Sequence, residues 1–139
     1  MNSTFKKSTI AVVLSFCMLS LVAFNTAAVA KNAGTNKTIE KAREAVNQAS
    51  SDDWMTYAVS AEKCIRKNIN LKEAAEWLDR SLAIKETPYN LKVKGLYYEK
   101  NNLPEKALEY YVKSLKVGIE NDVTYEDLHT QAKVAKLIK

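Results

Sequence analysis

Residues 91–115 read LKVKGLYYEKNNLPEKALEYYVKSL, and two helical patterns with a break between them are visible in this stretch. The first half places Leu91, Gly95 and Tyr98 on one helical stripe, which ends at the asparagines of 101–102. Pro104 suits the first turn of a second helix, where no backbone N–H donor is needed. The second helix carries its small and apolar residues at three- and four-residue steps: Ala107, Leu108, Tyr111, Ser114 and Leu115. Two antiparallel helices joined by a short turn are therefore predicted.

A second copy of this pattern occurs earlier in the chain. Residues 70–82 (NLKEAAEWLDRSL) align with residues 102–115 (NLPEKALEYYVKSL) when one residue is inserted. The offset is 32 residues before the insertion and 33 after it. A period of this length is typical of repeat proteins in which helical hairpins stack side by side.

The spacing of the small and aromatic residues resembles that of the tetratricopeptide repeat. Leu91, Gly95, Tyr98, Ala107 and Tyr111 stand in the signature places, whereas Lys94 departs from the usual leucine. In the preceding repeat Ala74 and Leu78 match, and Glu62 replaces the glycine. A third first helix, with Tyr125, Leu128, His129 and Ala132, looks like a terminal capping helix. Sel-like repeats share the same features and remain an alternative.

The resemblance implies a fold and a set of packing residues. The expected fold is all-α: a short right-handed α/α solenoid of stacked antiparallel helix hairpins with a C-terminal capping helix, over residues 38–139. Gly95 and Ala107 are expected where two helices cross closely, with Tyr98 and Tyr111 beside the crossing. Ala74 and Leu78 have the corresponding packing role in the earlier hairpin.

Local signals predict where the remaining helices begin and end. Helices are expected over 38–49, 54–68, 70–85 and 124–138, and no alternating run predicts a strand. Thr87-Pro88 is expected to close the helix over 70–85 and to begin the next one. Ser50 and Ser51 are predicted to cap the second helix, with acids in its first turn. Gly118 is predicted to stop the helix that starts at Pro104. Thr124 and Asp127 resemble a capping box for the last helix.

The first thirty residues have the order of a secretory signal peptide. Lys6 and Lys7 precede the apolar run 10–24, and Ala28-Val29-Ala30 offers a cleavage site. The run is shorter than the roughly twenty residues of a spanning helix, which disfavours an uncleaved anchor. A lipoprotein anchored at Cys17 is the weaker alternative. Residues 31–37 are expected to form a flexible linker, and the protein is expected to be periplasmic or secreted.

Charge and residue content disfavour several classes of function. Removal of residues 1–30 lowers the formal charge from +5 to +3, too little to indicate a nucleic-acid partner. His129 is the only histidine, and Cys64 is the only cysteine after residue 30. Cys64 lies on an apolar stripe and is expected to be a buried thiol. No enzyme activity, cofactor or metal site is therefore predicted, and an enzyme would require a polar pocket beside His129.

The resemblance also implies a place for a partner. In tetratricopeptide arrays the first helix of each hairpin lines a concave groove, in which extended peptides lie. Carried over to this chain, the groove residues are Lys63, Arg66, Lys67, Tyr89, Lys92, Leu96 and Lys100. Such a basic groove favours an acidic segment or a chain-terminal carboxylate, although the family's carboxylate-clamp pattern is not reproduced. The alternative is that these charges are only solvated.

Two functions follow as expectations. The first is an exported, non-enzymatic module that binds a peptide or protein partner, without nucleic acid and without a stable membrane span after signal cleavage. The alternative is a self-associating structural or assembly protein of the cell envelope, whose exposed repeat ends stack on copies of itself.

Overall fold

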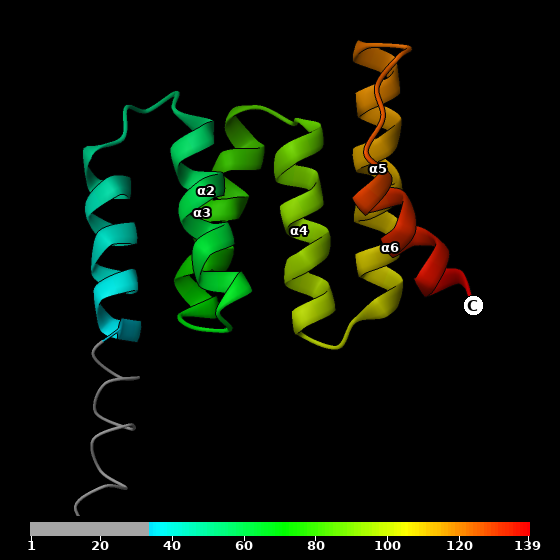
Figure 1. Ribbon diagram of the computed structural model, residues 1–139. Helices are drawn as coiled ribbons and strands as arrows, with labels where there is room; N and C mark the ends of the chain where they lie inside the picture. The colour runs from blue at the N-terminus through cyan, green and yellow to red at the C-terminus, as the bar shows by residue number, and fades with distance from the viewer. Residues whose placement is uncertain (1–33) are drawn as a thin grey trace, which may run out of the picture. The chain divides into compact units, whose positions relative to one another are not determined.

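The computed structural model of this protein describes residues 34–139, and the predicted signal peptide lies outside this range. Residues 34–48 are helical, followed by α2 (Trp54–Arg66), α3 (Leu71–Ile84), α4 (Pro88–Lys100), α5 (Pro104–Asn121) and α6 (Leu128–Ile138) (Figure 1). There is no strand between residues 34 and 139, and the all-α class is confirmed. None of the helices in this range is both long and apolar enough to cross a membrane.

The first helix differs from expectation at its start. Residues 34–37 are helical, so this part of the predicted flexible linker is regular structure. Residues 34–38 include no proline, so the helix that carries Thr38 can extend back over them without an interruption. Thr38–Lys139 forms one compact unit, which therefore begins inside a helix.

Polar caps set the starts of α2 and α4. Asp53, rather than Ser50 or Ser51, caps α2, and its carboxylate accepts a hydrogen bond from the Thr56 N–H at 2.9 Å. Ser50 instead donates to Asp52 at 2.7 Å, which takes its hydroxyl away from the helix. Thr87 caps α4 in a capping box with Asn90, directly before Pro88. The break predicted at Thr87-Pro88 is thus confirmed.

The two turns that join α2 to α3 and α4 to α5 are built alike. Asn68 and Asn102 both adopt left-handed backbone conformations, with φ of 55° and 56°. In each case the next residue's N–H reaches back into the helix, from Ile69 to Cys64 O and from Leu103 to Tyr98 O, both at 3.0 Å. This is the Schellman ending, which asparagine tolerates better than most residues. Asn68 therefore corresponds to Asn102, which replaces the predicted match of Asn70 with Asn102. Asn70 is an extra residue in the earlier turn.

The contacts within the two helix pairs are also equivalent. In Figure 1, α2 runs antiparallel to α3 and α4 antiparallel to α5, and these pairs share the most extensive contacts. Ser81 donates to the Trp54 carbonyl at 2.8 Å, and Ser114 donates to the Pro88 carbonyl at 2.7 Å. First helices are therefore offset by 34 residues and second helices by 33. The place of Gly95 is taken in α2 by the fully buried Ala61, not by Glu62 as predicted.

Gly95 is required by the aromatic ring on the neighbouring helix. A Cβ atom at Gly95 would lie 2.6 Å from Cδ1 and 2.7 Å from Cε1 of Tyr111. Ala107 and Tyr111 are buried on α5, whereas Tyr98 is half-buried beside the ring of Tyr110 at 5.3 Å between centroids. The close approach of α4 and α5 is thus made by a glycine and a tyrosine.

Lys94 replaces the apolar residue expected at its position without leaving the interior. Its side chain is buried and forms an ion pair with Asp79 of α3, whose own side chain is mostly exposed. The ammonium group also lies 5.4 Å from the ring centroids of Tyr97 and Tyr98. The long stem of lysine thus fills apolar space while its charge is satisfied at the edge.

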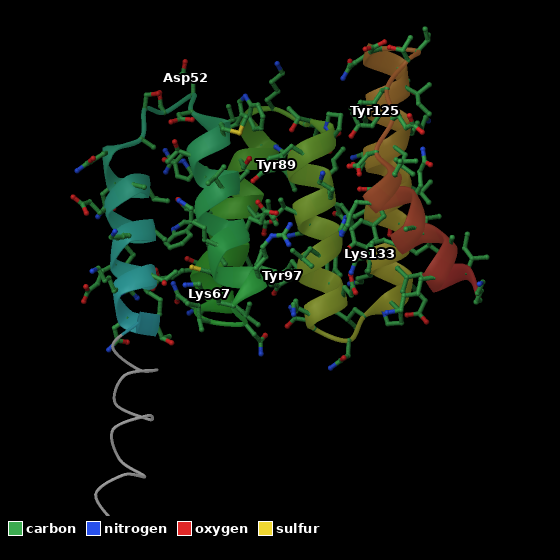
Figure 2. All side chains as sticks on the ribbon, viewed as in Figure 1. Asp52, Lys67, Tyr89, Tyr97, Tyr125 and Lys133 are labelled. Carbon is green, nitrogen blue, oxygen red and sulfur yellow. The ribbon has the colours of Figure 1, made fainter. Side chains whose placement is uncertain are left out.

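The end of α5 departs from prediction. The helix continues through Gly118 to Asn121, so Gly118 does not stop it. A Cβ at Gly118 would lie 2.2 Å from Cδ1 of Tyr125, whose side chain lies beside α5 (Figure 2). Gly118 is therefore small to admit a ring from the following loop, not to end the helix.

The last helix starts later and faces differently from expectation. Asp127 alone caps α6 through the Thr130 N–H at 3.0 Å, while the Thr124 hydroxyl donates to Asp122. Of the apolar stripe predicted for this helix (Tyr125, Leu128, Ala132, Ala135 and Leu137 or Ile138), Tyr125 and Leu137 are half-buried, and Leu128, Ala132 and Ala135 are exposed. Thr130, Lys133 and Val134, which the stripe did not include, are packed as well. Because α5 has an extra turn and a loop follows it, α6 begins at Leu128, later than predicted. A different set of its residues therefore faces the other helices.

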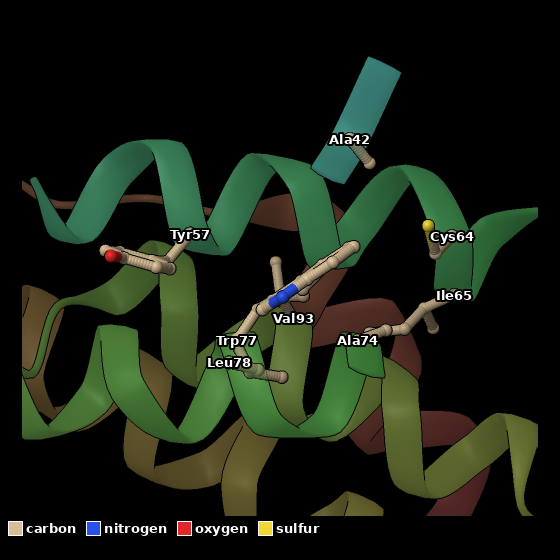
Figure 3. Packing of buried hydrophobic residues seen from close by; sticks show 9 residues of the cluster. Ala42, Tyr57, Cys64, Ile65, Ala74, Trp77, Leu78 and Val93 are labelled. Carbon is tan, nitrogen blue, oxygen red and sulfur yellow. The ribbon is translucent and has the colours of Figure 1, made fainter. Parts of the chain in front are cut away.

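The apolar core lies between the first helix, α2 and α3, with a contribution from α4 (Figure 3). Ala42 brings the first helix into this core, and Arg43 holds it there with two hydrogen bonds to the Glu73 carboxylate, at 2.5 and 2.8 Å. Trp77 and Leu78 project from α3, and the Cys64 thiol is fully buried, as predicted. The core cluster is Ala42, Tyr57, Ala61, Cys64, Ile65, Ala74, Trp77, Leu78 and Val93.

Candidate partner-binding groove

A small cavity opens on the surface where α2, α4 and α6 come together. Its volume is about 70 Å³, and Val93, Leu96 and Tyr111 form its apolar part. Charged residues surround this part: Glu62, Arg66, Lys92, His129 and Lys133. The cavity therefore includes three residues predicted for the groove, namely Arg66, Lys92 and Leu96.

Ion pairs neutralise most of the cations around this cavity. Lys92 Nζ lies 2.8 Å from Asp127 Oδ2, and Arg66 Nη2 lies 2.7 Å from Glu62 Oε1. Lys133 Nζ lies 2.7 Å from Glu99 Oε1. The centre of the groove is thus close to neutral, which differs from the basic groove predicted from the sequence.

Two tyrosine hydroxyls position the carboxylates of the groove, one on the half-buried Tyr89 and one on the buried Tyr111. Tyr89 donates to Glu62 Oε2 at 2.5 Å, and Tyr111 donates to Glu99 Oε2 at 2.7 Å. Burial, together with the neighbouring carboxylates, raises the pKa of both phenols well above the usual value. Both hydroxyls remain protonated donors at neutral pH, so Tyr89 serves to hold Glu62 rather than to present a free hydroxyl.

Asp127 ties α6 to this surface. Its burial alone would raise its pKa, but the hydrogen bonds from Lys92 and Thr130 outweigh this and lower the pKa to about 2. The carboxylate is therefore charged at neutral pH, where it both caps α6 and pairs with α4. Lys92 has a structural partner that the sequence pattern did not reveal.

A second, larger pocket is strongly basic. It has a volume of about 360 Å³ and is lined by Thr38, Lys41, Lys63, Arg66 and Lys67. Lys67 Nζ donates to the Thr38 hydroxyl at 2.8 Å, a bond that joins the first helix to the end of α2. Three predicted groove residues meet here, and Lys41 joins them because the first helix packs on α2.

The seven predicted groove residues therefore divide between two places. Arg66 lines both pockets, so the two are neighbours. Lys100 is exposed in the last turn of α4 and lines neither of them. The others are Lys92 and Leu96 at the small cavity, Tyr89 bonded to Glu62 beside it, and Lys63 and Lys67 at the basic pocket.

The residues considered for chemistry are not brought together as a catalytic pair. His129 is exposed at the rim of the small cavity, whereas the Cys64 thiol is fully buried in the core. Burial raises the pKa of this thiol, which disfavours the thiolate that a nucleophile requires. Within residues 34–139, no three or more His, Cys, Asp or Glu side chains are grouped so that they could hold a metal ion.

Comparison of the chain with protein-family models, with curated proteins and with solved structures finds no match. The geometry and the charge of the two pockets are therefore the features of this protein that bear on its function.

Proposed function

We propose that this protein is a non-enzymatic protein-interaction module of the helical-repeat type. In this proposal, α2–α3 and α4–α5 are successive hairpins of a right-handed solenoid, related to tetratricopeptide or Sel-like repeats, and α6 is the capping helix. The support is the repetition of detail: the asparagine turns at 68 and 102, and the hydroxyls of Ser81 and Ser114 on equivalent carbonyls. Such hairpins expose their first helices on one face.

The groove on that face is the proposed binding site for a peptide or protein segment. The observation that carries this proposal is that α2, α4 and α6, with Tyr111 of α5, together line the small cavity, and that Arg66 joins it to the basic pocket. A cavity of about 70 Å³ is far below the several hundred cubic ångströms of most small-molecule sites. It suits one small side chain of a partner.

Export remains part of the proposal. Its support is the order of residues in the first thirty positions, with Lys6 and Lys7 before the apolar run and Ala28-Val29-Ala30 after it. Expression in a bacterial host, followed by mass spectrometry of the recovered protein, tests it. A new N-terminus at Lys31 supports export, and a chain that retains residues 1–30 contradicts it.

Affinity capture with matched variants tests the groove. The full chain is immobilised beside the groove variant Arg66→Glu/His129→Trp and the control Lys85→Glu, which changes the charge equally at an exposed position away from both pockets. Partners captured by the full chain and the control, but lost by the groove variant at unchanged helical content, support the proposal. Partners captured equally by all three would exclude this groove as the binding site.

Self-association is a second candidate function, and one observation favours it. Large apolar side chains are exposed near the C-terminal end, including Leu128 at 67% and Ile138 at 68%, with Val112 and Ile119 on α5. Sedimentation of the full chain over a range of concentrations distinguishes the two candidates. A dimer or larger species that Leu128→Glu dissociates would favour assembly, and a monomer at all concentrations would favour the groove.

A further inference from the structure

The basic pocket carries more positive charge than its surroundings neutralise. Among the described residues, 34–139, four cationic side chains line it and no acidic side chain does. Lys41 and Lys63 form no ion pair with any residue in 34–139, and Lys67 is bonded only to a neutral hydroxyl. Of these four cations, Arg66 alone has an acidic partner within the described part of the chain, namely Glu62.

The helix end does not account for this charge. Lys63 and Arg66 lie in the last turn of α2, where cations offset the negative end of the helix dipole. That end is equivalent to only about half an elementary charge. Since Glu62 neutralises Arg66, the three lysines leave a surplus of about two and a half positive charges, which favours an anionic ligand.

We infer that the partner of this groove is an acidic peptide that places its carboxylates in the basic pocket and a small aliphatic side chain in the neighbouring cavity. This inference rests on the proposed function. Arg66 lines both pockets, so the carboxylates and the aliphatic group lie close together along the peptide. The cavity of about 70 Å³ has room for a few water molecules, and its apolar part, Val93, Leu96 and Tyr111, favours replacing them with methyl groups.

The acidic residues of the partner bind electrostatically in the basic pocket, which is separate from the nearly neutral small cavity at the centre of the groove. Lys92 and Lys133 are occupied by Asp127 and Glu99, so carboxylates gain little there. The acidic part of the peptide is therefore directed to Lys41, Lys63 and Lys67. This assigns a binding role to Lys41, which lies outside the repeats.

The probe is a fluorescently labelled peptide with two glutamates, one glycine and one valine between glycine-serine ends. Its binding to the full chain is followed by fluorescence anisotropy, beside two peptides in which glutamine replaces glutamate or serine replaces valine. Each exposed ion pair contributes modestly to affinity, and the loss of two or more pairs together weakens binding about tenfold. We expect the glutamine peptide to bind about tenfold more weakly and added salt to weaken only the acidic peptides.

Variants of exposed residues locate the two groups. Lys41→Glu/Lys63→Glu is expected to weaken the acidic peptide tenfold or more and to remove its advantage over the glutamine peptide. Lys72→Glu/Lys85→Glu, with the same charge change on exposed sites outside both pockets, is expected to leave affinity within twofold. His129→Trp occupies the rim of the cavity and is expected to remove the preference for valine over serine.

Three results would overturn the inference: no binding of the acidic peptide, equal binding of the glutamate and glutamine peptides, or an unchanged affinity in Lys41→Glu/Lys63→Glu. These failures are distinguishable from failure of the proposed function. A peptide that binds without charge preference, and that Arg66→Glu/His129→Trp releases, leaves the groove in place and removes only its acidic partner.

Discussion

Replacing Gly95 by alanine tests the close packing between α4 and α5. The added Cβ would lie 2.6 Å and 2.7 Å from two ring carbons of Tyr111, closer than real Cβ contacts come. The ring cannot retreat easily, because it is 2% exposed and its hydroxyl is bonded to Glu99 at 2.7 Å. The substitution must therefore displace the ring or one of the helices.

The magnitude follows from two opposing effects. Overpacking of a core typically costs about 1–3 kcal/mol, whereas alanine stabilises a helix by about 1 kcal/mol relative to glycine. We expect Gly95→Ala to lower the free energy of unfolding by about 1 kcal/mol. In the α2–α3 pair the equivalent positions hold Ala61 and Leu78, both fully buried. In a Tyr111→Leu background, Gly95→Ala is thus expected to stabilise by up to about 1 kcal/mol.

The assay is a double-mutant cycle measured by urea unfolding of the full chain, followed by circular dichroism. The expected coupling between positions 95 and 111 is about 2 kcal/mol, within the range of residues in direct contact. Tyr111→Leu alone also loses the bond to Glu99, but that loss cancels in the cycle. If Gly95→Ala raises stability equally in both backgrounds, the ring does not exclude a side chain at this position.

Three further predictions concern polar groups. The pKa of Asp127 is lowered to about 2, so its carboxylate contributes to the free energy of unfolding above pH 4 and loses this contribution as the pH falls through 2. Asp127→Asn should lower the free energy of unfolding by about 1 kcal/mol at pH 7. In this variant the free energy of unfolding should also change less between pH 4 and pH 2. Asn90→Ala should cost about 2–3 kcal/mol in urea unfolding, because its buried amide donates to Ser81 Oγ at 3.0 Å and to the Lys85 carbonyl at 2.7 Å. Lys94→Leu should leave thermal stability unchanged or raise it, because leucine fills the same space without a charge to desolvate, and a lower melting temperature would contradict this.

The parts of the fold that could be predicted are those set by residues close together in sequence. Pro88 and Pro104 mark helix starts through their fixed backbone angle and missing N–H, and both helices begin there. Cys64 was predicted to be buried from its place on an apolar stripe, and it is. In each case the residues that give the signal lie within one or two helical turns of the residues whose structure they determine.

The errors arose where a distant part of the chain decides the outcome. Gly118 looks like a helix stop, but it is small because the Tyr125 ring packs on it. Which residues of α6 are buried depends on where α5 ends, and the apolar pattern within α6 carries no information about that. Likewise, Lys92 looks like a free groove cation until Asp127, 35 residues away, reaches it. Lys41 is not among the predicted groove residues, because its helix lies outside the repeats and the sequence does not show where that helix packs.

The buried position of Cys64 offers a way to time the opening of this protein under native conditions. Because its sulfur is inaccessible in the closed state, a thiol reagent can modify it only during excursions that separate α2 from its neighbours. In a Cys17→Ser background, the labelling rate relative to that of a free thiol therefore gives the population of those excursions. A peptide bound in the groove should slow this labelling in proportion to the fraction of protein it occupies, because the bound protein opens less often. The Cys64 sulfur can therefore report both on local opening and on peptide binding.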